Sequence, residues 1–422
     1  MTDAAAGPFA GLRVVEFGRF IAAPYCGQLL ADGGADVVKV EDVGGDETRR
    51  NGPIVEGEGR QFLNKNRGKR SLAADLSDAT VAAAVRRLAG GADVVVANFR
   101  PGQAERLGLD YASVGTANPR LIYAENTAFG QHGPMAGMAG MDIAVAGYSG
   151  MAQFTADGPL PLPEPIIDYT AGLLLAWGIS TALYHRERTG RGQKLDVSLL
   201  HAALVLQNNN VNHVDVVDGW RQEFVAGLKS AFAEGRSWEE ILAFRESLQP
   251  YAITRAYYGF FRTADGVIAV AGISRTLQAR IVGILGIADR WVTEAGWLPE
   301  DARAHAREVH AQAARVFAAR SSAEWIGLFV AAGVPACPVQ FREQLIDDEQ
   351  ARANGAFVEL EHELVGRHTV VAPPVRFSES PLRALAASPP LGRDTAAVLH
   401  EAGLDDTTIA ALTASGAIRT SR

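Results

Sequence analysis

Short apolar runs alternate with helical patterns in the first part of the chain, and this alternation constrains the fold more than any other feature. The segments that read as strands are 12–17, 36–40, 93–97 and 121–124. Helical patterns at 24–32 and 77–88 lie between them. Strands that are joined through helices form right-handed crossovers and a mostly parallel sheet, and strands buried on both faces are apolar almost throughout. The sequence therefore predicts an α/β fold.

A different pattern begins near residue 205, where polar helical sequence continues to about residue 250. Residues 257–270 then have the composition of a β-hairpin with an Ala-Asp-Gly turn. An alanine-rich helix is expected at 302–319, and Ser321 with Glu324 has the spacing of a capping box that begins another helix. These features predict a smaller α+β domain. The pieces after it read as strand, strand and helix, at 370–371, 375–377 and 406–414.

Composition narrows the classes of function. With 422 residues and a formal net charge of −8, the chain gives no reason to expect a nucleic-acid partner. Its two cysteines, Cys26 and Cys337, cannot form a disulfide framework or a four-cysteine zinc site, which fits a reducing cytoplasm. His305 and His310 do not have the spacing of a helical metal pair, so no metal site is expected.

Secretion and membrane insertion are not expected either. The N-terminal segment Met1–Gly11 carries no basic cluster and no long apolar region, unlike a signal peptide. The most apolar stretch, Ala171–Tyr184, is shorter than the roughly 20 residues that a transmembrane helix needs. We therefore interpret this stretch as a buried helix.

Two polar segments are candidates for ligand binding. Residues 64–71 read Asn-Lys-Asn-Arg-Gly-Lys-Arg-Ser, which composition alone interprets as a solvated loop. Asn98, Phe99 and Arg100 follow a predicted buried strand, and Arg106 comes shortly after. Ligands of open parallel sheets lie at the carboxyl ends of the strands, where an amide, an aromatic ring and two arginines would suit a purine and phosphates. Plain turn chemistry is an equal alternative for this second segment.

Asp168 ends an apolar run and precedes a strongly apolar helix. The simpler interpretation is that it caps this helix. The alternative is a nucleophile, because a carboxylate at the positive end of a helix keeps its ordinary pKa of about 3.9 and stays ionised. Such a carboxylate needs no partner base. The residues alone leave both roles open, with capping the simpler.

Ordered motifs along nearly the whole chain resemble one known family. The segments that carry the resemblance are GLRVVEF (11–17), GADVVKVE (34–41), NRGKRS (66–71), NFRPG (98–102), RLGL (106–109), NPRLIY (118–123), FGQHGP (129–134), RTGRGQ (188–193) and GVPACPV (333–339). They are similar to the family III CoA-transferases of the CaiB–BaiF group, which includes formyl-CoA transferase and α-methylacyl-CoA racemase.

This resemblance implies roles for particular residues. The family's nucleophilic aspartate, followed four residues later by glycine, falls on Asp168 and Gly172. It implies that CoA moves from an acyl-CoA thioester to a small carboxylic acid through an aspartyl-CoA thioester, with CoA as substrate and no tightly bound cofactor. Gly272, after the hairpin, is implied to belong to a mobile lid. The implied CoA contacts are Ile21, Ala22, Asn98, Phe99, Arg100 and Arg106.

Two positions depart from the formyl-CoA transferase pattern. Ile21 stands where that enzyme has glutamine, which argues against oxalate or formyl-CoA as substrates. Asp42 stands at a position where that enzyme has a basic CoA-binding residue, so one phosphate contact needs another source.

The racemase branch of the family is the first alternative. That branch needs a second acid–base group, a histidine that precedes the aspartate of a Gly-x-Asp segment, to move a proton at the opposite face of the α-carbon. Met141 precedes Asp142 in this chain and cannot carry a proton, which favours the transferase. Asp142 is either an accessory residue that orients Asp168 or the acceptor, or an ordinary turn or capping residue. A catalytically inactive CoA-binding homologue is the second alternative.

The resemblance also implies an arrangement of domains and chains. Residues 1–205 would form the first part of a large, Rossmann-like CoA-binding domain, and residues 335–422 would return to it. Residues 225–330 would form the small α+β domain. Two chains would form an interlocked homodimer, a ring threaded through a ring. The residues do not identify the donor and acceptor acids. The resemblance alone favours succinyl-CoA as donor and a dicarboxylate as acceptor.

Overall fold

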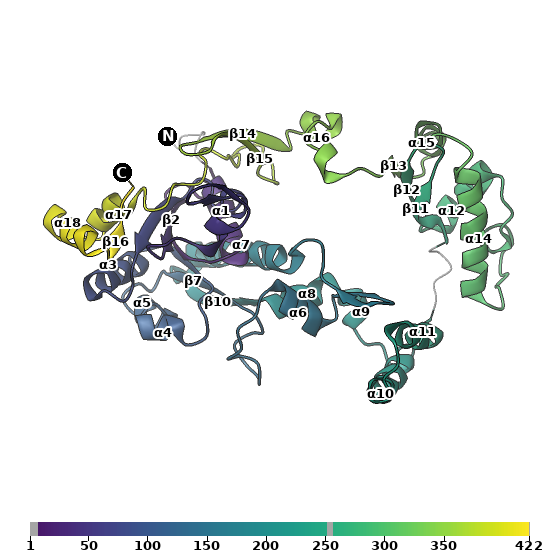
Figure 1. Cartoon of the computed structure of the whole chain (residues 1–422), viewed down its shortest axis with the longest axis horizontal. Helices are drawn as coiled ribbons and strands as arrows, with labels where there is room; N and C mark the ends of the chain where they lie inside the picture. The colour runs from purple at the N-terminus through teal and green to yellow at the C-terminus, as the bar shows by residue number, and fades with distance from the viewer. Residues whose placement is uncertain (1–6, 251–255, 422) are drawn as a thin grey trace. The chain divides into compact units, whose positions relative to one another are not determined.

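The computed structural model describes residues 7–250 and 256–421, and the chain divides into two compact units (Figure 1). The larger unit consists of Met1–Val214 together with Arg352–Arg422, and the smaller unit is Asp215–Ala351. The C-terminal segment therefore belongs to the same unit as the N-terminal one. The prediction that the chain has no signal peptide concerns Met1–Gly11, of which residues 1–6 lie outside the described ranges.

A seven-stranded sheet with the order β10-β7-β6-β1-β2-β5-β16 forms the centre of the larger unit. Its strands are β1 (Arg13–Phe17), β2 (Asp36–Glu41), β5 (Arg70–Ala74), β6 (Val94–Ala97), β7 (Ile122–Thr127), β10 (Gln193–Ser198) and β16 (Ile418–Arg419). Neighbouring strands pair in parallel, except that β16 pairs antiparallel with β5. The predicted α/β fold with a mostly parallel sheet is confirmed.

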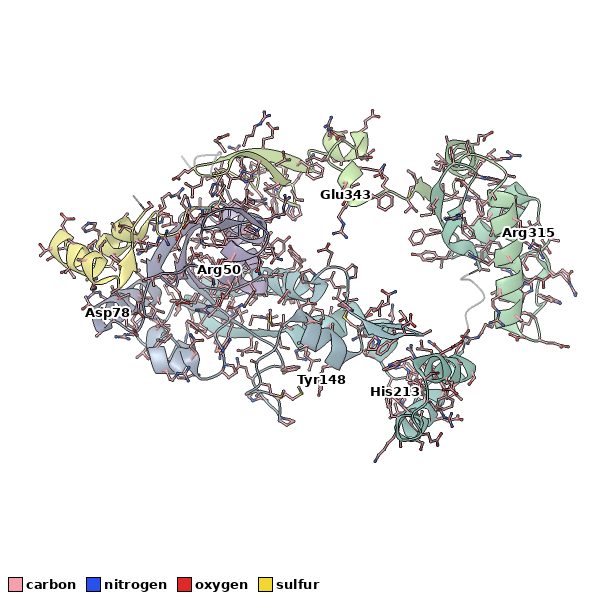
Figure 2. All side chains as sticks on the ribbon, viewed as in Figure 1. Arg50, Asp78, Tyr148, His213, Arg315 and Glu343 are labelled. Carbon is pink, nitrogen blue, oxygen red and sulfur yellow. The ribbon has the colours of Figure 1, made fainter. Side chains whose placement is uncertain are left out.

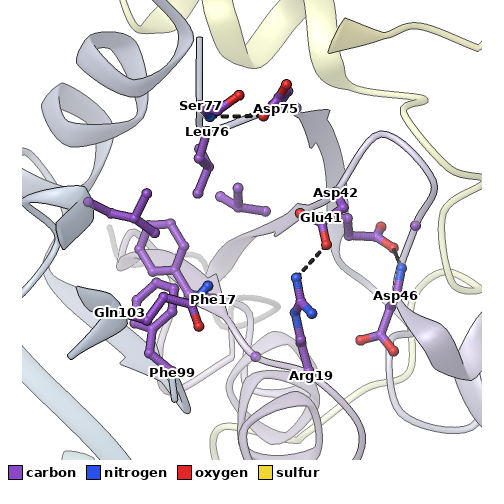
Figure 3. Close-up of a pocket in the computed structure, with 15 residues that line it drawn as sticks. Phe17, Arg19, Glu41, Asp42, Asp46, Asp75, Leu76, Ser77, Phe99 and Gln103 are labelled. Atoms are coloured by element: carbon purple, nitrogen blue, oxygen red, sulfur yellow. Dashed lines mark hydrogen bonds and ion pairs between the residues drawn. The ribbon is translucent and has the colours of Figure 1, made fainter. Parts of the chain in front are cut away.

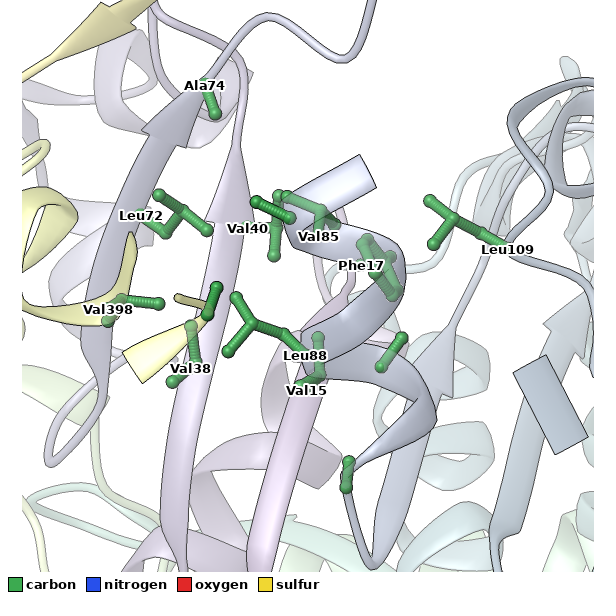
Figure 4. Packing of buried hydrophobic residues seen from close by; sticks show 14 of the residues in the cluster. Val15, Phe17, Val38, Val40, Leu72, Ala74, Val85, Leu88, Leu109 and Val398 are labelled. Carbon is green, nitrogen blue, oxygen red and sulfur yellow. The ribbon is translucent and has the colours of Figure 1, made fainter. Parts of the chain in front are cut away.

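Helices cover both faces of this sheet, and alternate residues of each strand enter two different cores. The covering helices are α1 (Ala22–Asp32), α3 (Ala79–Gly90), α7 (Ile166–Thr189), α17 (Thr395–Glu401) and α18 (Asp406–Ser415). Val15 and Val38 pack with α3, α17 and α18 (Figure 4). Val14 and Val37 pack with α1 and α7. Burial on both faces explains why the strand runs are apolar almost throughout.

Helix α7 is longer than the apolar stretch in the sequence indicates. It has 24 residues, and by length and composition it is the one helix among the described residues that could cross a membrane. The prediction that this segment is too short to span a bilayer is therefore wrong. Its buried residues Ala171, Leu175, Ile179 and Ala182 pack in the cores that α7 shares with neighbouring helices and strands. A core helix passes the same composition test, so the length of α7 is weak evidence for a membrane span.

Shorter elements complete the larger unit. They are η1 (Glu47–Arg50), β3 (Pro53–Val55), β4 (Glu58–Gly59), α2 (Arg60–Leu63), α4 (Gln103–Leu107), α5 (Tyr111–Gly115), α6 (Asp142–Ser149), β8 (Gln153–Thr155), β9 (Gly158–Leu160), α8 (Leu199–Leu206), α9 (Asn208–Val211), β14 (Phe357–His362) and β15 (Gly366–Val371). Helix α16 (Glu349–Ala353) lies at the boundary between the units.

The smaller unit combines helices with a three-stranded antiparallel sheet of order β11-β12-β13. Its elements are α10 (Gly219–Ala233), α11 (Trp238–Leu248), β11 (Tyr258–Arg262), β12 (Val267–Ala271), α12 (Arg275–Leu285), α13 (Arg290–Thr293), α14 (Ala302–Phe317), α15 (Ser322–Ala331), β13 (Ala336–Pro338) and η3 (Arg342–Gln344). Strands β11 and β12 form the predicted hairpin, and Ser321 and Glu324 form the predicted capping box at α15. Aromatic residues Phe261, Phe317 and Trp325 fill its core.

Two expectations about the later part of the chain differ from the structure. Ala336–Pro338 was expected within the segment that returns to the large domain, but it forms β13 and pairs with β12 in the smaller unit. Residues 375–377 are not a strand, whereas 370–371 end β15. Three-residue apolar pieces of this kind do not distinguish a strand from an extended loop, because pairing depends on a partner far away in the sequence.

Candidate active site

Asp168 lies in the first turn of α7, where a second carboxylate holds the end of the helix. Asp142, the first residue of α6, accepts hydrogen bonds through Oδ2 from the backbone nitrogens of Ile167 at 3.0 Å and Asp168 at 3.1 Å. The side chain of Asp168 makes no capping hydrogen bond, and the residue before the helix is Pro165. The capping role considered for Asp168 is therefore wrong, and Asp142 satisfies these helix N–H groups instead.

Burial sets the charge state of Asp168. Its removal from water raises its pKa to about 7, and the nearby Asp142 carboxylate acts in the same direction. Lys65 opposes both effects by favouring the ionised form. The expectation that a helix N-terminus keeps the pKa of Asp168 at its ordinary value is wrong, because burial outweighs the helix dipole. The carboxyl group is thus poised to change its charge near neutral pH.

Lys65 and two tyrosines surround the start of α7. The Lys65 side chain is buried, and its Nζ lies 5.7 Å from the centroid of the Tyr169 ring. The rings of Tyr25 and Tyr169 meet edge to face with centroids 5.1 Å apart. Burial lowers the pKa of Lys65, while the neighbouring Asp168 carboxylate raises it. Asp168 therefore has aromatic side chains and one buried ammonium group in its surroundings.

Gly172 allows α7 to approach α1 closely. A Cβ atom at Gly172 would lie 2.8 Å from the backbone oxygen of Ala22 and 3.1 Å from Cδ1 of Tyr25. The glycine four residues after the aspartate therefore has a packing reason. This contact brings the loop after β1, with Ile21 and Ala22, to the same end of α7 as Asp168. Both of these predicted CoA contacts are buried, at 8% and 1% exposed, so their side chains serve mainly in packing.

A pocket of about 240 Å³ opens at the carboxyl ends of β1, β2 and β5 (Figure 3). Phe17 and Phe99 line one side, with ring centroids 5.2 Å apart. Arg19 and Asp42 line another side, where Arg19 forms ion pairs with Asp42 and with Glu47. This is the edge of the sheet at which open α/β folds bind ligands. An aromatic wall beside a guanidinium group suits a nucleotide.

Asn98 holds the loop after β1 rather than pointing a free amide into solvent. Its Oδ1 accepts a hydrogen bond from the Arg19 nitrogen at 2.9 Å, and its Nδ2 donates to the Arg19 oxygen at 2.8 Å. The next residue, Phe20, has a φ of 63°, in the left-handed region that a bulky side chain rarely adopts. Asn98 therefore positions Arg19 at the pocket edge through the backbone.

Arg100 and Arg106 have exposed guanidinium groups that form no ion pair with any described residue. Arg106 lies in α4, and Gln103 and Leu107 of this helix line the same pocket. The structure thus brings Phe99 and the two predicted arginines to one end of the sheet. Arg19 was not predicted, although a basic residue directly after the first strand was an available signal.

Most of the basic segment 64–71 is buried, with Asn64 and Gly68 exposed, so its interpretation as a solvated loop is wrong. Lys69 Nζ lies 2.7 Å from Glu16 Oε2, and the guanidinium group of Arg67 donates to both oxygens of Asp32 at 2.8 and 2.6 Å. A buried charge requires a partner, so Glu16 within an otherwise apolar strand was the available signal.

Gly272 lies in the smaller unit, where close packing accounts for the absence of a side chain. A Cβ atom there would lie 2.4 Å from Cδ1 of Ile281, and the backbone nitrogen donates to the Tyr257 oxygen at 3.0 Å. Its part in a lid stays a prediction. In the described ranges no three His, Cys, Asp or Glu side chains are grouped so as to hold a metal ion.

The larger unit is thus an α/β domain with a partly buried carboxyl group, Asp168, at the start of α7 and a pocket at the carboxyl ends of its strands. Comparisons with known proteins identify the family. A family model described as CoA-transferase family III matches residues 9–395, so the chain belongs to this family. The chain is 36% identical over 414 residues to a succinate–glutarate CoA-transferase of Agrobacterium fabrum, covering 93% of this chain and 95% of the relative. It is 30% identical over 419 residues to the mouse succinyl-CoA:glutarate CoA-transferase, covering 97% and 90%.

A solved structure supports the same assignment. A CaiB/BaiF family protein from Brucella suis superposes with a TM-score of 0.72 at 30% identity, covering 94% of this chain and 100% of that protein. The resemblance inferred from the sequence motifs is confirmed, and the chain is an enzyme that transfers CoA between an acyl-CoA and a carboxylic acid.

Proposed function

We propose that Asp168 is the nucleophile that carries CoA from donor to acceptor as an aspartyl-CoA thioester. The observation that carries this proposal is the carboxyl group of Asp168, which is partly buried in the first turn of α7, accepts no hydrogen bond from the described residues and has a pKa of about 7. A carboxylate without hydrogen-bond donors from the described residues is less stabilised than one in water, and it is correspondingly more nucleophilic.

The reaction balances without a net proton. An Asp168 oxygen attacks the thioester carbonyl, the carbon–sulfur bond breaks, and CoA leaves as a thiolate from a mixed anhydride. The thiolate then attacks the aspartyl carbonyl, which forms the enzyme thioester and releases the donor acid as a carboxylate. The acceptor carboxylate attacks the aspartyl carbonyl of this thioester, the carbon–sulfur bond breaks, and CoA thiolate leaves behind a second mixed anhydride. The thiolate then attacks the acceptor's acyl carbonyl, which forms the new acyl-CoA and releases Asp168 as a carboxylate. Each intermediate is an activated acyl group, so every step is reversible.

The nucleotide part of CoA is assigned to the pocket that Phe99 and Arg19 line. The Phe17–Phe99 wall offers a surface for the adenine ring, and Arg100 and Arg106 offer unpaired guanidinium groups for phosphates. Asp42 is acidic and cannot bind a phosphate in place of the basic residue of formyl-CoA transferase. Arg19, which pairs with Asp42, offers a positive charge at the same place. Supporting this assignment is the position of the pocket at the carboxyl ends of the strands.

We propose dicarboxylates as substrates. Support comes from the names of two relatives, a succinate–glutarate CoA-transferase and a succinyl-CoA:glutarate CoA-transferase. Racemisation is the alternative. Met141 argues against it, because a methionine side chain cannot exchange a proton with the α-carbon of the substrate. Incubating an α-methylacyl-CoA with the enzyme in D₂O without an acceptor acid would give deuterium at the α-carbon only for a racemase.

The proposal is tested by trapping the thioester. After incubation with succinyl-CoA, the denatured protein should gain the mass of CoA minus water, and hydroxylamine should remove this addition. D168N should show no addition, whereas D157N, an equivalent change at an exposed turn between β8 and β9, should behave as the wild type. An addition that persists in D168N would refute the role of Asp168. An inactive CoA-binding homologue would show no addition in any variant.

We also propose that the chain acts as a homodimer. Leu173, Trp177 and Tyr184 lie along one side of α7 and are 49%, 70% and 65% exposed. Tyr148 of α6 is a further exposed aromatic side chain (Figure 2). Large apolar side chains gathered on the surface favour a protein interface, and the family resemblance favours a second copy of this chain. Light scattering that gives the mass of a monomer would contradict this proposal.

A further inference from the structure

The buried lysines of the larger unit fall into two kinds. Lys39 and Lys69 each pair directly with Glu16, at 3.1 and 2.7 Å, and both donate further hydrogen bonds to backbone oxygens. Lys65 is equally buried, with 4% of its surface exposed, but it has no carboxylate within ion-pair distance among the described residues. Its one hydrogen bond there runs from Nζ to the Gln61 oxygen at 3.3 Å.

A buried ammonium group with so few partners is costly, which makes a purely structural role a poor explanation for Lys65. Its Nζ lies near the ring of Tyr169, the residue that follows Asp168 on α7. Among the carboxylates that act on Lys65, the strongest influence comes from Asp168, ahead of Asp46 and Glu164. The positive charge of Lys65 is therefore directed at the start of α7.

We propose that Lys65 is a positioning residue whose positive charge keeps Asp168 ionised for attack on the thioester. This inference rests on the proposed role of Asp168 as nucleophile. The charged groups that act on Asp168 are Asp142 from α6, which disfavours its ionisation, and Lys65 from the loop after α2, which favours it. Tyr169, beside it on α7, has a raised pKa and is neutral at neutral pH. Lys65 is thus the group that offsets burial and Asp142.

The first test is the pH dependence of thioester formation in a single turnover at saturating succinyl-CoA. The rate should rise with pH as Asp168 loses its proton. Loss of an opposite charge beside a carboxylate raises its pKa by about one unit or more. K65M should therefore move the midpoint upward by about one pH unit and slow the reaction about tenfold on the acidic side. K65R, which keeps the charge, should restore the midpoint.

K194M is the matched control. Lys194 pairs with Glu125 and Asp196 on the strands β7 and β10, and Asp168 is not among the groups that shift its pKa. This variant removes the same charge from the chain and should leave the midpoint unchanged. A K65M midpoint equal to that of the wild type would overturn the inference, as would a K65R midpoint equal to that of K65M.

A second measurement covers the case in which K65M does not fold. Coupling between two charges is reciprocal, so removing the charge of Asp168 should lower the pKa of Lys65. Competitive labelling with acetic anhydride at neutral pH, followed by peptide mass spectrometry, should show Lys65 about tenfold more reactive in D168N than in the wild type. Equal reactivity would overturn the inference. If the wild type forms no thioester, the nucleophile proposal fails, while this labelling result still reports on the pair.

Discussion

The contact between α7 and α1 gives a sharp prediction for G172A. The added Cβ would lie 2.8 Å from the Ala22 oxygen, a backbone atom, about 0.6 Å short of ordinary van der Waals contact. Overpacking of this kind costs about 1–3 kcal/mol, and the better helix propensity of alanine returns up to about 1 kcal/mol. We expect a net loss of about 1–2 kcal/mol, or a melting temperature lower by about 2–3 °C for a unit of this size.

The same change should also disturb catalysis. Relieving the contact shifts the start of α7 relative to the loop after β1, and a misplacement of about 1 Å can reduce a rate by about 100-fold. Thermal unfolding and the rate of thioester formation measure the two effects. G283A is the control, because a Cβ at this position in α12 meets no atom within 4 Å. If G172A matched the wild type in both measurements, close packing would not be the reason for this glycine.

Three further changes test the charges at the site. D142N removes the negative charge that disfavours ionisation of Asp168, so the pH midpoint of thioester formation should fall below that of the wild type. Combining R100A with R106A should raise the KM for acyl-CoA about tenfold or more while kcat changes little, as kinetics with succinyl-CoA would show. The pKa of Asp168 is higher in the folded state than in the unfolded chain, so its contribution to stability falls as pH rises from about 4 to about 7. D168N should therefore stabilise the protein more at pH 8 than at pH 4, which melting curves at the two pH values would reveal.

The central sheet was predictable because its signal is local. Apolar runs such as 36–40 and 93–97 need burial on both faces, and helices between them enforce parallel pairing. Strands β5, β10 and β16 were not predicted, and β5 (Arg70–Ala74) begins inside the basic segment that was interpreted as a loop. Strand β10 (Gln193–Ser198) is polar and lies at one edge of the sheet. Strand β16 (Ile418–Arg419) has only two residues, and its partner β5 lies more than 300 residues earlier in the sequence. Such edges depend on tertiary partners that no sequence window contains.

Family motifs alone singled out Asp168 and Gly172, and the catalytic role of Asp168 stays a prediction. Asp168 and Gly172 were placed by resemblance, and the structure supplies a packing reason for the glycine. Lys65 was not singled out, because the composition of its segment alone indicates a solvated basic loop. Its burial follows from contacts of the same segment with Asp32 and Glu16, which precede it by more than thirty residues. The composition of a short segment does not reveal which distant acidic residues will pair with its basic ones.

Two aspartates lie at the start of α7: Asp142 holds the end of the helix, and Asp168 is the residue that we propose as the nucleophile. Asp142 accepts the hydrogen bonds of the first N–H groups of α7, although it lies 26 residues before Asp168. Asp168 is consequently left without a hydrogen bond from the described residues, and burial raises its pKa toward neutrality. A carboxylate in that state depends on a nearby positive charge to remain a nucleophile, and Lys65 is the cation that acts on it. In the mechanism that we propose, capping by Asp142 leaves the carboxyl group of Asp168 free to attack the thioester, and the charge of Lys65 keeps that group ionised.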